Sequence, residues 1–337
     1  MNGKKCMALG LSLALGLAAL TGCAPQNKDA AGGDAGTASQ VVIYSNADDE
    51  AITAMENALN AGGYEGQYLL ETFGTSELGG KLLVEGTNLE ADLVTMSTFY
   101  LQSAQNRNNM FKPLDFAVST QEEFPDCCAP ITSQEGAIIL NTNLLAENGL
   151  DRPASLKDLA DPQYAGHLAV TDIQSSSTAW LLIQALVDAY GESEAQTVLA
   201  GIYENAGDHI ESSGSAPLKL CRAGEVAIGF GLRHQAVADQ AGGLPIDYVD
   251  PAEGNFSLTE SVSVVDKGDK TNPLAMEMAQ CIIENARAEL IQTYPNPLYV
   301  GEIADPANRS SYPKTFGEPL TFELFQTHQE LSEAAKP

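Results

Sequence analysis

Basic side chains are scarce in this chain of 337 residues. It has 17 lysines and arginines against 45 aspartates and glutamates, and its formal net charge at pH 7 is −28. Nucleic-acid phosphates and anionic lipid headgroups are held by clustered lysine and arginine. The composition therefore argues against a nucleic-acid-binding protein and against one that lies flat on an anionic membrane. The acidic residues are spread along the chain, and their simplest role is to keep the protein soluble and monomeric by repulsion.

Long apolar runs are absent except near the N-terminus. There, Lys4 and Lys5 precede an apolar run from residue 7 to residue 20. No later run approaches the ~20 residues that a membrane-spanning helix needs. A basic start, a short apolar run and small residues before a cleavage point are typical of a secretory signal peptide, which we expect over residues 1–22. The protein is therefore expected to leave the cytoplasm.

The apolar run ends in Leu20-Thr21-Gly22-Cys23, which resembles the lipobox of bacterial lipoproteins. The resemblance implies that Cys23 carries a lipid, becomes the mature N-terminus and anchors the protein to the cell membrane on its extracytoplasmic side. An ordinary signal peptide that contains a cysteine by chance is the alternative. Residues 23–40 are rich in Ala, Gly, Asp, Asn and Gln without apolar periodicity, so we expect a flexible tether there.

Zinc-binding patterns of cysteine and histidine are absent too. Four cysteines follow the tether, namely Cys127, Cys128, Cys221 and Cys281. None belongs to a C-x-x-C pair or has a histidine at a zinc-binding spacing. Four cysteines permit three disulfide pairings, and the sequence does not choose among them. A bridge between the adjacent Cys127 and Cys128 would be strained. We expect free, partly buried thiols, and neither a structural metal nor a cofactor.

From residue 41 onward, short apolar strands alternate with helical patterns. A long irregular stretch at residues 111–134 precedes a short strand at residues 136–140, and a second strand–helix set begins at residue 166. Apolar strands separated by helices predict an α/β protein with mainly parallel sheets covered on both faces. Two sheets joined by extended crossings indicate two lobes. We expect lobe 1 at residues 41–132 with 251–296, lobe 2 at residues 133–250, and a C-terminal extension at residues 297–337 that packs on the lobes.

Small hydroxyl residues follow several predicted strands, at the points where helices begin. Ligands of open α/β sheets bind beyond the carboxyl ends of the strands, and helix N-termini favour anions. Serine and threonine are also ordinary helix caps, which is the simpler explanation for any single cluster. Several clusters in two lobes instead predict a shared cleft for an oxyanion such as phosphate, phosphonate or carboxylate. The candidate ligand-binding residues are Ser45, Asn46, Gly74, Thr75, Ser76, Ser97, Ser175, Ser176, Ser177, Thr178, Gly214 and Ser215.

One arginine is placed to join this set. Arg233 follows a predicted strand at residues 226–230 and a Gly-Phe-Gly turn at residues 229–231. A guanidinium at that position could grip an anion through two parallel hydrogen bonds. A solvated surface arginine is an equally simple explanation of the same position. We include Arg233 among the candidate ligand-binding residues.

Patterns of catalytic residues are weak. No Gly-x-Ser-x-Gly turn occurs, and the chain has only 4 histidines. His209 lies near Ser212 and could form a base–nucleophile pair in an extracellular hydrolase. An exposed loop histidine is the simpler interpretation, and an adhesive or structural lipoprotein is a further alternative. We expect a binding protein and not an enzyme.

Four short stretches carry a resemblance to a known family. Residues 42–45 read Val-Ile-Tyr-Ser, residues 74–78 read Gly-Thr-Ser-Glu-Leu, and residues 213–217 read Ser-Gly-Ser-Ala-Pro shortly before Gly-Glu-Val-Ala-Ile-Gly at residues 224–229. Over residues 41–291 the chain resembles bacterial extracellular solute-binding proteins of the iron(III), polyamine and 2-aminoethylphosphonate group. The resemblance implies two Rossmann-like lobes joined by extended hinge strands, as in type II periplasmic binding proteins. It also implies a solute held between the lobes and an ABC permease in the membrane as partner.

The solute expected from these residues is a small organic anion. Iron binders of this group typically present adjacent tyrosines after the strand that matches residues 226–230, whereas this chain has Gly-Leu-Arg-His at residues 231–234. A hard ferric ion favours phenolate oxygen, so a phosphonate or organophosphate is the preferred solute. Ferric iron, a polyamine or thiamine remain the alternatives. An amine on the solute would pair with Glu77 or Glu260.

Overall fold

The computed structural model describes residues 40–317 and 320–337. The expected signal peptide, the lipidation site Cys23 and nearly all of the tether lie outside the described residues. Within these residues, no helix combines the length and hydropathy that crossing a bilayer requires. The described residues belong to one compact unit of the chain.

The first half of the fold alternates strands and helices from residue 41 to residue 108. Its elements are β1 (Val41–Ser45), α1 (Asp49–Ala61), β2 (Tyr68–Thr72), α2 (Thr75–Glu85), a short 3-10 helix (Gly86–Asn88), β3 (Leu93–Ser97) and α3 (Thr98–Asn108). The three strands are parallel, with β1 between β2 and β3. All five residues of β3 are buried, as the continuous apolar run predicts for a sheet covered on both faces.

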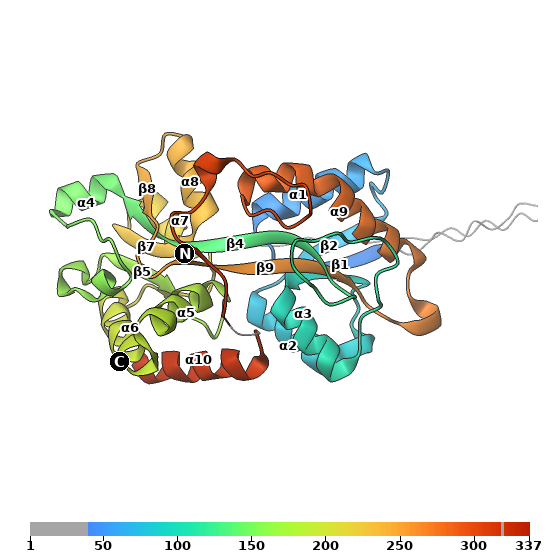
Figure 1. The fold of residues 1–337 in the computed structure, drawn as a ribbon, viewed down its shortest axis with the longest axis horizontal. Coiled ribbons are helices and arrows are strands. Elements are labelled where there is room, and N and C mark those ends of the chain that lie inside the picture. The colour runs from blue at the N-terminus through green and yellow to red at the C-terminus, as the bar shows by residue number, and fades with distance from the viewer. Residues whose placement is uncertain (1–39, 318–319) are drawn as a thin grey trace, which may run out of the picture. The chain divides into compact units, whose positions relative to one another are not determined.

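Two long strands connect this half to the second. They are β4 (Ala129–Asn141) and β9 (Asn255–Val264), which run side by side through the centre of Figure 1. Strand β9 is antiparallel to β3 through residues 260–264 and to β4 through residues 257–262. Residues 136–141 of β4 then pair with strands of the second half. Each long strand therefore crosses from one half of the sheet to the other.

The second half repeats the alternation. Its elements are α4 (Thr142–Asn148), two 3-10 helices (Lys157–Ala160 and Pro162–Tyr164), β5 (Leu168–Thr171), α5 (Thr178–Tyr190), α6 (Glu192–Ala206), β6 (Ile210–Glu211), α7 (Ala216–Ala223), β7 (Ile228–Leu232), α8 (Arg233–Ala241) and β8 (Ile246–Val249). Strand β5 is parallel to both β6 and β7, and β7 is antiparallel to β4. Helix α5 lies deep in the core, and its Trp180 is fully buried.

The chain then returns to the first half of the fold, and its C-terminal elements contact both halves. The remaining elements are a 3-10 helix (Gly268–Lys270), α9 (Pro273–Thr293), a 3-10 helix (Pro306–Asn308), β10 (Pro313–Lys314) and α10 (Phe322–Ala335). Helix α9 packs against α1, and β10 pairs with β9. Phe325 of α10 packs its ring against Phe99 of α3 and Trp180 of α5. The C-terminal helix therefore contacts both halves of the fold.

The structure differs in one respect from the expected pair of separate sheets. All ten strands of the described residues belong to one sheet, in the order β2-β1-β3-β9-β4-β7-β5-β6, with β10 on β9 and β8 on β4. The strand expected at residues 136–140 is only the second half of β4. Its first half was missed because polar residues such as Thr132 and Gln134 interrupt the apolar pattern there. The α/β class with extended strands joining two halves is confirmed.

All four cysteines of the described residues are free and buried. The Sγ atoms of Cys127 and Cys128 lie 3.7 Å apart without a bond between them. Burial raises the pKa of the Cys221 thiol to about 12. The expected free thiols are therefore present, and they are more fully buried than the sequence indicates.

Stability is expected to fall in mild acid because of a buried histidine. The indole Nε1 of Trp180 donates to Nδ1 of His328 at 2.7 Å, and His328 is 2% exposed. Burial lowers the pKa of His328 from 6.5 to about 4. The unfolded chain thus binds the proton more tightly, so this stability is present above pH 6.5 and is lost as the pH falls toward 4. Urea unfolding at pH 7.5 and pH 5 should show a loss of about 2 kcal/mol from this group.

The matched variant for this prediction is His328→Gln. Glutamine can still accept from the indole of Trp180 but does not titrate, so its unfolding free energy should fall by about 2 kcal/mol less over the same pH interval. An equal pH dependence in the variant and the native protein would show that His328 is not the responsible group.

Candidate ligand-binding cleft

Loops from both halves of the sheet surround one cavity of about 360 Å³. From the first half, it is lined by residues 46–50, which follow β1 and include the start of α1, and by residues 72–75, which run from the end of β2 to the start of α2. From the second half, it is lined by residues 176–178 at the start of α5 and by residues 212–215 before α7. These loops follow the carboxyl ends of strands, which is where ligands of open α/β sheets bind. We take this cleft as the candidate ligand-binding site.

Most of the loop residues predicted from the sequence line this cavity. Hydroxyl groups from α2, from the start of α5 and from the loop before α7 face the same space, although the first lies more than 100 residues from the others in the chain. Contact with a solute remains a prediction for each of them. The predicted residues that line the cavity are Asn46, Gly74, Thr75, Ser176, Ser177, Thr178, Gly214 and Ser215.

Two predicted serines lie inside the sheet instead. Ser45 is fully buried, and its Oγ accepts from Thr95 Oγ1 at 2.7 Å and from the Ala47 amide at 3.1 Å. Ser97 is 2% exposed at the end of β3. Both side chains are therefore buried within the sheet, and neither lines the cavity. A serine that ends a strand and one that begins the loop look alike in the sequence.

Two further predicted serines lie beside the cavity without lining it. Ser76 on α2 donates its hydroxyl to the carbonyl oxygen of Gln174 in the second half. Ser175 is half-buried, and its amide donates to Asp172. The contact of Ser76 joins the two halves of the fold next to the cleft.

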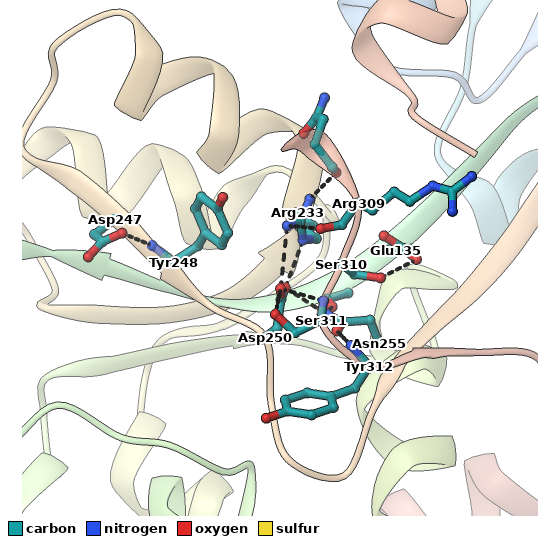
Figure 2. Close-up of polar contacts among 12 residues, drawn as sticks. Glu135, Arg233, Asp247, Tyr248, Asp250, Asn255, Arg309, Ser310, Ser311 and Tyr312 are labelled. Atoms are coloured by element: carbon teal, nitrogen blue, oxygen red, sulfur yellow. Dashed lines mark hydrogen bonds and ion pairs between the residues drawn. The ribbon is translucent and has the colours of Figure 1, made fainter. Parts of the chain in front are cut away.

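Arg233 does not take the position that we expected. It is 3% exposed, and its Nε donates to Asp250 Oδ1 at 2.7 Å. Its Nη1 donates to the carbonyl of Asn308 at 2.7 Å and its Nη2 to that of Arg309 at 3.1 Å. Figure 2 shows this guanidinium held between Asp250 and the C-terminal segment. Every nitrogen of Arg233 is thus engaged away from the cavity, and Arg233 is not among the residues that line it.

Two helices open into the cleft with unused cap hydroxyls. Ser177 is the N-cap of α5 and Ser215 is the N-cap of α7, and neither side chain makes a capping hydrogen bond. Ser213 Oγ lies 3.3 Å from Ser215 Oγ. Ordinary capping would occupy such hydroxyls with the first amides of the helix. Because no helix amide uses these two hydroxyls, a role in binding a ligand is favoured over the capping explanation.

Two basic side chains, Lys219 and Arg222, also line the cleft, although neither is among the candidate residues predicted from the sequence. Lys219 of α7 is exposed and has no ion-pair partner in the described part of the chain. Arg222, one turn later, is paired through Nε and Nη2 with Asp239, the latter at 2.7 Å. Lys219 is therefore the cation that is available to an anionic ligand. Its place one turn after a Ser-rich loop is the sequence signal that could have identified it.

Acidic groups occupy the opposite wall. Asp48, the N-cap of α1, accepts from the Ala51 amide at 3.3 Å and from the Tyr294 hydroxyl. Burial by itself would raise the pKa of Asp48, but the adjoining His234 and these hydrogen bonds hold it below the usual value. Asp48 is therefore a carboxylate at neutral pH. The cleft has a donor-rich wall in its second half and a carboxylate in its first half.

The long strands complete the cavity with Gln134 of β4 and Glu260 of β9. Glu260 is 8% exposed and accepts from Thr132 Oγ1 at 3.3 Å. Burial and the charge of Asp48 raise the pKa of Glu260 to about 8. Glu77 and Glu260 are the two acids predicted to pair with an amine. Glu260 lines the cleft, whereas Glu77 is exposed and does not line it.

A glycine in the Ser-rich loop allows this loop to pack against α5. A Cβ at Gly214 would lie 2.1 Å from Thr178 Oγ1 and 3.0 Å from Thr178 Cβ. We expect Gly214→Ala to displace the loop, to cost about 1–3 kcal/mol of unfolding free energy and to weaken solute binding. Gly80→Ala is the control, because a Cβ at Gly80 in α2 meets nothing within 4 Å. Urea unfolding should separate the two variants, and equal stability would contradict this packing.

Comparison with known proteins places these features in a family. Residues 69–293 match the family model described as bacterial extracellular solute-binding protein. A protein of Haemophilus influenzae described as uncharacterized is 32% identical over 127 residues. That match covers 37% of this chain and 36% of the relative, so it spans about a third of the relative's length.

Solved structures show the same fold at low sequence identity. The periplasmic binding protein AfuA from Actinobacillus pleuropneumoniae, with fructose-6-phosphate bound, superposes with a TM-score of 0.67 at 18% identity, covering 88% of this chain and 97% of that one. A periplasmic thiamin binding protein gives 0.70 at 17% identity, covering 88% and 95%. Iron-bound HitA from Pseudomonas aeruginosa gives 0.68 at 18%, covering 88% and 99%. With the family model matched over most of its folded residues, the chain belongs to the family of bacterial extracellular solute-binding proteins.

Proposed function

We propose that this protein is the solute-binding component of an ABC importer and that it captures a small anionic solute of the phosphonate or organophosphate type. In this proposal the solute binds in the cleft between the two halves and is delivered to a permease in the membrane. The protein stays at the extracytoplasmic face of the membrane through a lipid on Cys23. The family membership supports the role as a binding protein, and the cleft supports the class of solute.

The observation that carries the proposal is the convergence of donors on one cavity. Ser177 and Ser215 offer hydroxyls that no helix amide uses, and Lys219 offers an ammonium group beside them. Phosphoryl oxygens accept hydrogen bonds from hydroxyls, helix amides and cations of this kind. Because the loops come from both halves, a solute that contacts both would shift the equilibrium toward a closed form. AfuA, a structural neighbour, is described with a phosphate ester bound.

The acidic wall supports a second candidate. Asp48, Glu50 and Glu260 line the same cavity. Asp48 is a carboxylate at neutral pH and favours a positive group, whereas Glu260, with its pKa raised to about 8, is mostly protonated there until a positive group binds beside it. A cationic solute such as thiamine or a polyamine would use this wall, and one structural neighbour is described as a thiamin binding protein. An anionic solute that also carries an amine would use both walls, with Glu260 as the partner of the amine. Ferric iron is less favoured because no tyrosine is among the described residues that line the cavity.

A thermal-shift screen of the mature chain tests the proposal. The compounds are 2-aminoethylphosphonate, sugar phosphates, thiamine, spermidine and ferric citrate. A solute at 100 times its dissociation constant adds about 2.7 kcal/mol of stability, which raises the melting temperature by several degrees. We expect this rise with a phosphonate or phosphate ester. Stabilisation by thiamine or spermidine alone would favour the second candidate, and stabilisation by ferric iron alone would overturn both.

The same preparation tests the absence of turnover. No hydrogen bond joins His209 to Ser212 in residues 40–317 and 320–337, so no contact there supports the base–nucleophile pair of a hydrolase. Incubation with phosphate esters and carboxylic esters should release no product. Product formation that Ser212→Ala abolishes would contradict the proposal.

A further inference from the structure

Three potential metal ligands meet at the acidic wall of the cleft. Asp48 and Glu50 come from the loop and first turn of α1, and His234 comes from the first turn of α8. One ligand atom from each lies within 4.8 Å of the other two. His234 Nε2 is 3.3 Å from Asp48 Oδ2. The group joins residues that are more than 180 positions apart in the sequence, and its two carboxylates line the proposed solute cavity.

The imidazole of this group is buried without hydrogen bonds. His234 is 4% exposed, and neither of its ring nitrogens has a hydrogen-bond partner in the described residues. Its ring packs against Tyr294, with centroids 4.3 Å apart. Asp48 Oδ2 likewise has no hydrogen bond, whereas its Oδ1 is occupied. His234 Nε2 and Asp48 Oδ2 face each other at 3.3 Å without forming a hydrogen bond, and His234 Nδ1 has no such neighbour. Buried polar atoms of native proteins are nearly always paired, so this arrangement indicates a partner that is absent from between them.

Two amides beside the group point to the same kind of partner. Gln235 is 5% exposed, and its Nε2 donates to Glu50 Oε2 at 3.4 Å, which leaves its Oε1 without a partner. Asn46 Nδ2 donates to Thr75 Oγ1 at 2.9 Å, which leaves its Oδ1 unpaired. The carboxylate of Glu50 fixes the orientation of the first amide, because only the nitrogen can donate to it. The unpaired atoms of these two amides, Gln235 Oε1 and Asn46 Oδ1, are oxygens, which accept hydrogen bonds or bind a positive group.

We propose that Asp48, Glu50 and His234 form a binding site for a divalent cation of the Zn²⁺ class, resident in the cleft. One imidazole and two carboxylates are a ligand set that Zn²⁺ accepts, while Ca²⁺ and Mg²⁺ prefer oxygen alone. The absence of thiolate from the set argues against a soft ion, and the neighbouring phenol of Tyr294 donates to Asp48 instead of offering a phenolate to Fe³⁺. Three protein ligands leave a fourth position of a tetrahedral ion open.

The cation would change what the acidic wall can hold. Without it, two carboxylates repel an anionic solute from the first half of the cleft. With it, that wall presents a positive charge, and an oxygen of the solute can occupy the open position opposite the donor loops of the second half. This step rests on the proposed function, because it assigns the ion a role in binding an anionic solute. The binding of the ion itself does not depend on the solute.

The test uses the full mature chain without a histidine tag, treated with chelator and dialysed. Isothermal titration with Zn²⁺ alone should show one site. Glu50→Gln should weaken it at least about tenfold, since loss of even an outer partner of a metal ligand costs about 10–100-fold. His234→Gln should abolish it, and the control His167→Gln should not change it, because His167 lies outside the cleft. Co²⁺ in place of Zn²⁺ should give the visible absorption of a tetrahedral ion.

Each outcome decides the inference. No binding, or binding that Glu50→Gln and His234→Gln leave unchanged, overturns it. Glu50 is exposed, so its variant remains informative if His234→Gln does not fold. Repeating the solute screen with and without chelator separates the two proposals. If the chelator leaves anion binding unchanged, the proposed function stands and the cation has no role in it. If Zn²⁺ binds but the screen finds no anionic solute, the cation site stands and the proposed class of solute is wrong.

Discussion

Replacement of Asp250 by alanine is expected to cost about 3–5 kcal/mol of unfolding free energy, because it leaves a buried guanidinium without its counter-charge. Asp250 accepts from Arg233 at 2.7 Å and from the backbone and hydroxyl of Ser311 at 2.8 and 2.9 Å. It also accepts from Asn255 Nδ2 at 3.0 Å. The carboxylate thus connects α8, β9 and the C-terminal segment, as Figure 2 shows. Urea unfolding of the native protein and the variant measures the loss.

Asp247→Ala provides the matched control for this prediction. Asp247 is three residues earlier and pairs with Arg152 at 2.5 Å, but the Arg152 side chain is 49% exposed. Solvent-exposed ion pairs contribute about 0–1 kcal/mol, so the control should unfold near the native urea concentration. Similar destabilisation by Asp250→Ala and Asp247→Ala would show that the burial of Arg233 does not decide the energetics of this network.

Replacement of Lys219 by alanine is expected to weaken the binding of the anionic solute at least about tenfold. A hydrogen bond to a charged group contributes about 1.5–3 kcal/mol, and 1.4 kcal/mol corresponds to a tenfold change in affinity. Lys219 is exposed, so the lower end of that range applies at physiological salt. Calorimetric titration with the solute found in the screen measures the change. The effect should shrink as salt is added, because the interaction is electrostatic.

Lys157→Ala is the control for this variant. Lys157 lies in the same half of the fold but pairs with Glu194 at 2.5 Å and is not among the residues that line the cleft. Removing it changes the net charge of the protein equally without touching the site. Equal loss of affinity in the two variants would reduce the role of Lys219 to a long-range charge effect. No loss in either variant would remove Lys219 from the site.

The architecture and the convergence of the loops could be predicted from local patterns. Apolar strands alternating with helices fix the α/β class, and hydroxyl clusters after strands mark the edge where ligands bind. This edge is defined by the direction of parallel strands, so residues as distant as Thr75 and Ser215 could be assigned to one cavity from the sequence alone. Ser45 and Ser97 were misplaced because a shift of one residue moves a side chain from the loop into the sheet.

The charged groups of the cleft could not be predicted in the same way. Arg233 lies where the sequence places it, but its partners Asp250 and Asn308 come from segments 17 and 75 residues later. Asp48 and His234 are likewise brought together only by the packing of α8 near α1. Long-range pairing of charges decides whether a guanidinium or an imidazole is free for a ligand, and a local pattern carries no information about it.

Hydrogen–deuterium exchange with the bound solute tests the central claim most directly, namely that loops from both halves hold one solute. The account predicts slower exchange at residues 46–50 and 72–75 together with residues 176–178 and 212–215, and no change at residues 308–311 of the C-terminal segment that contacts Arg233 and Asp250. Protection confined to one half of the fold, or centred on that C-terminal segment, would contradict it.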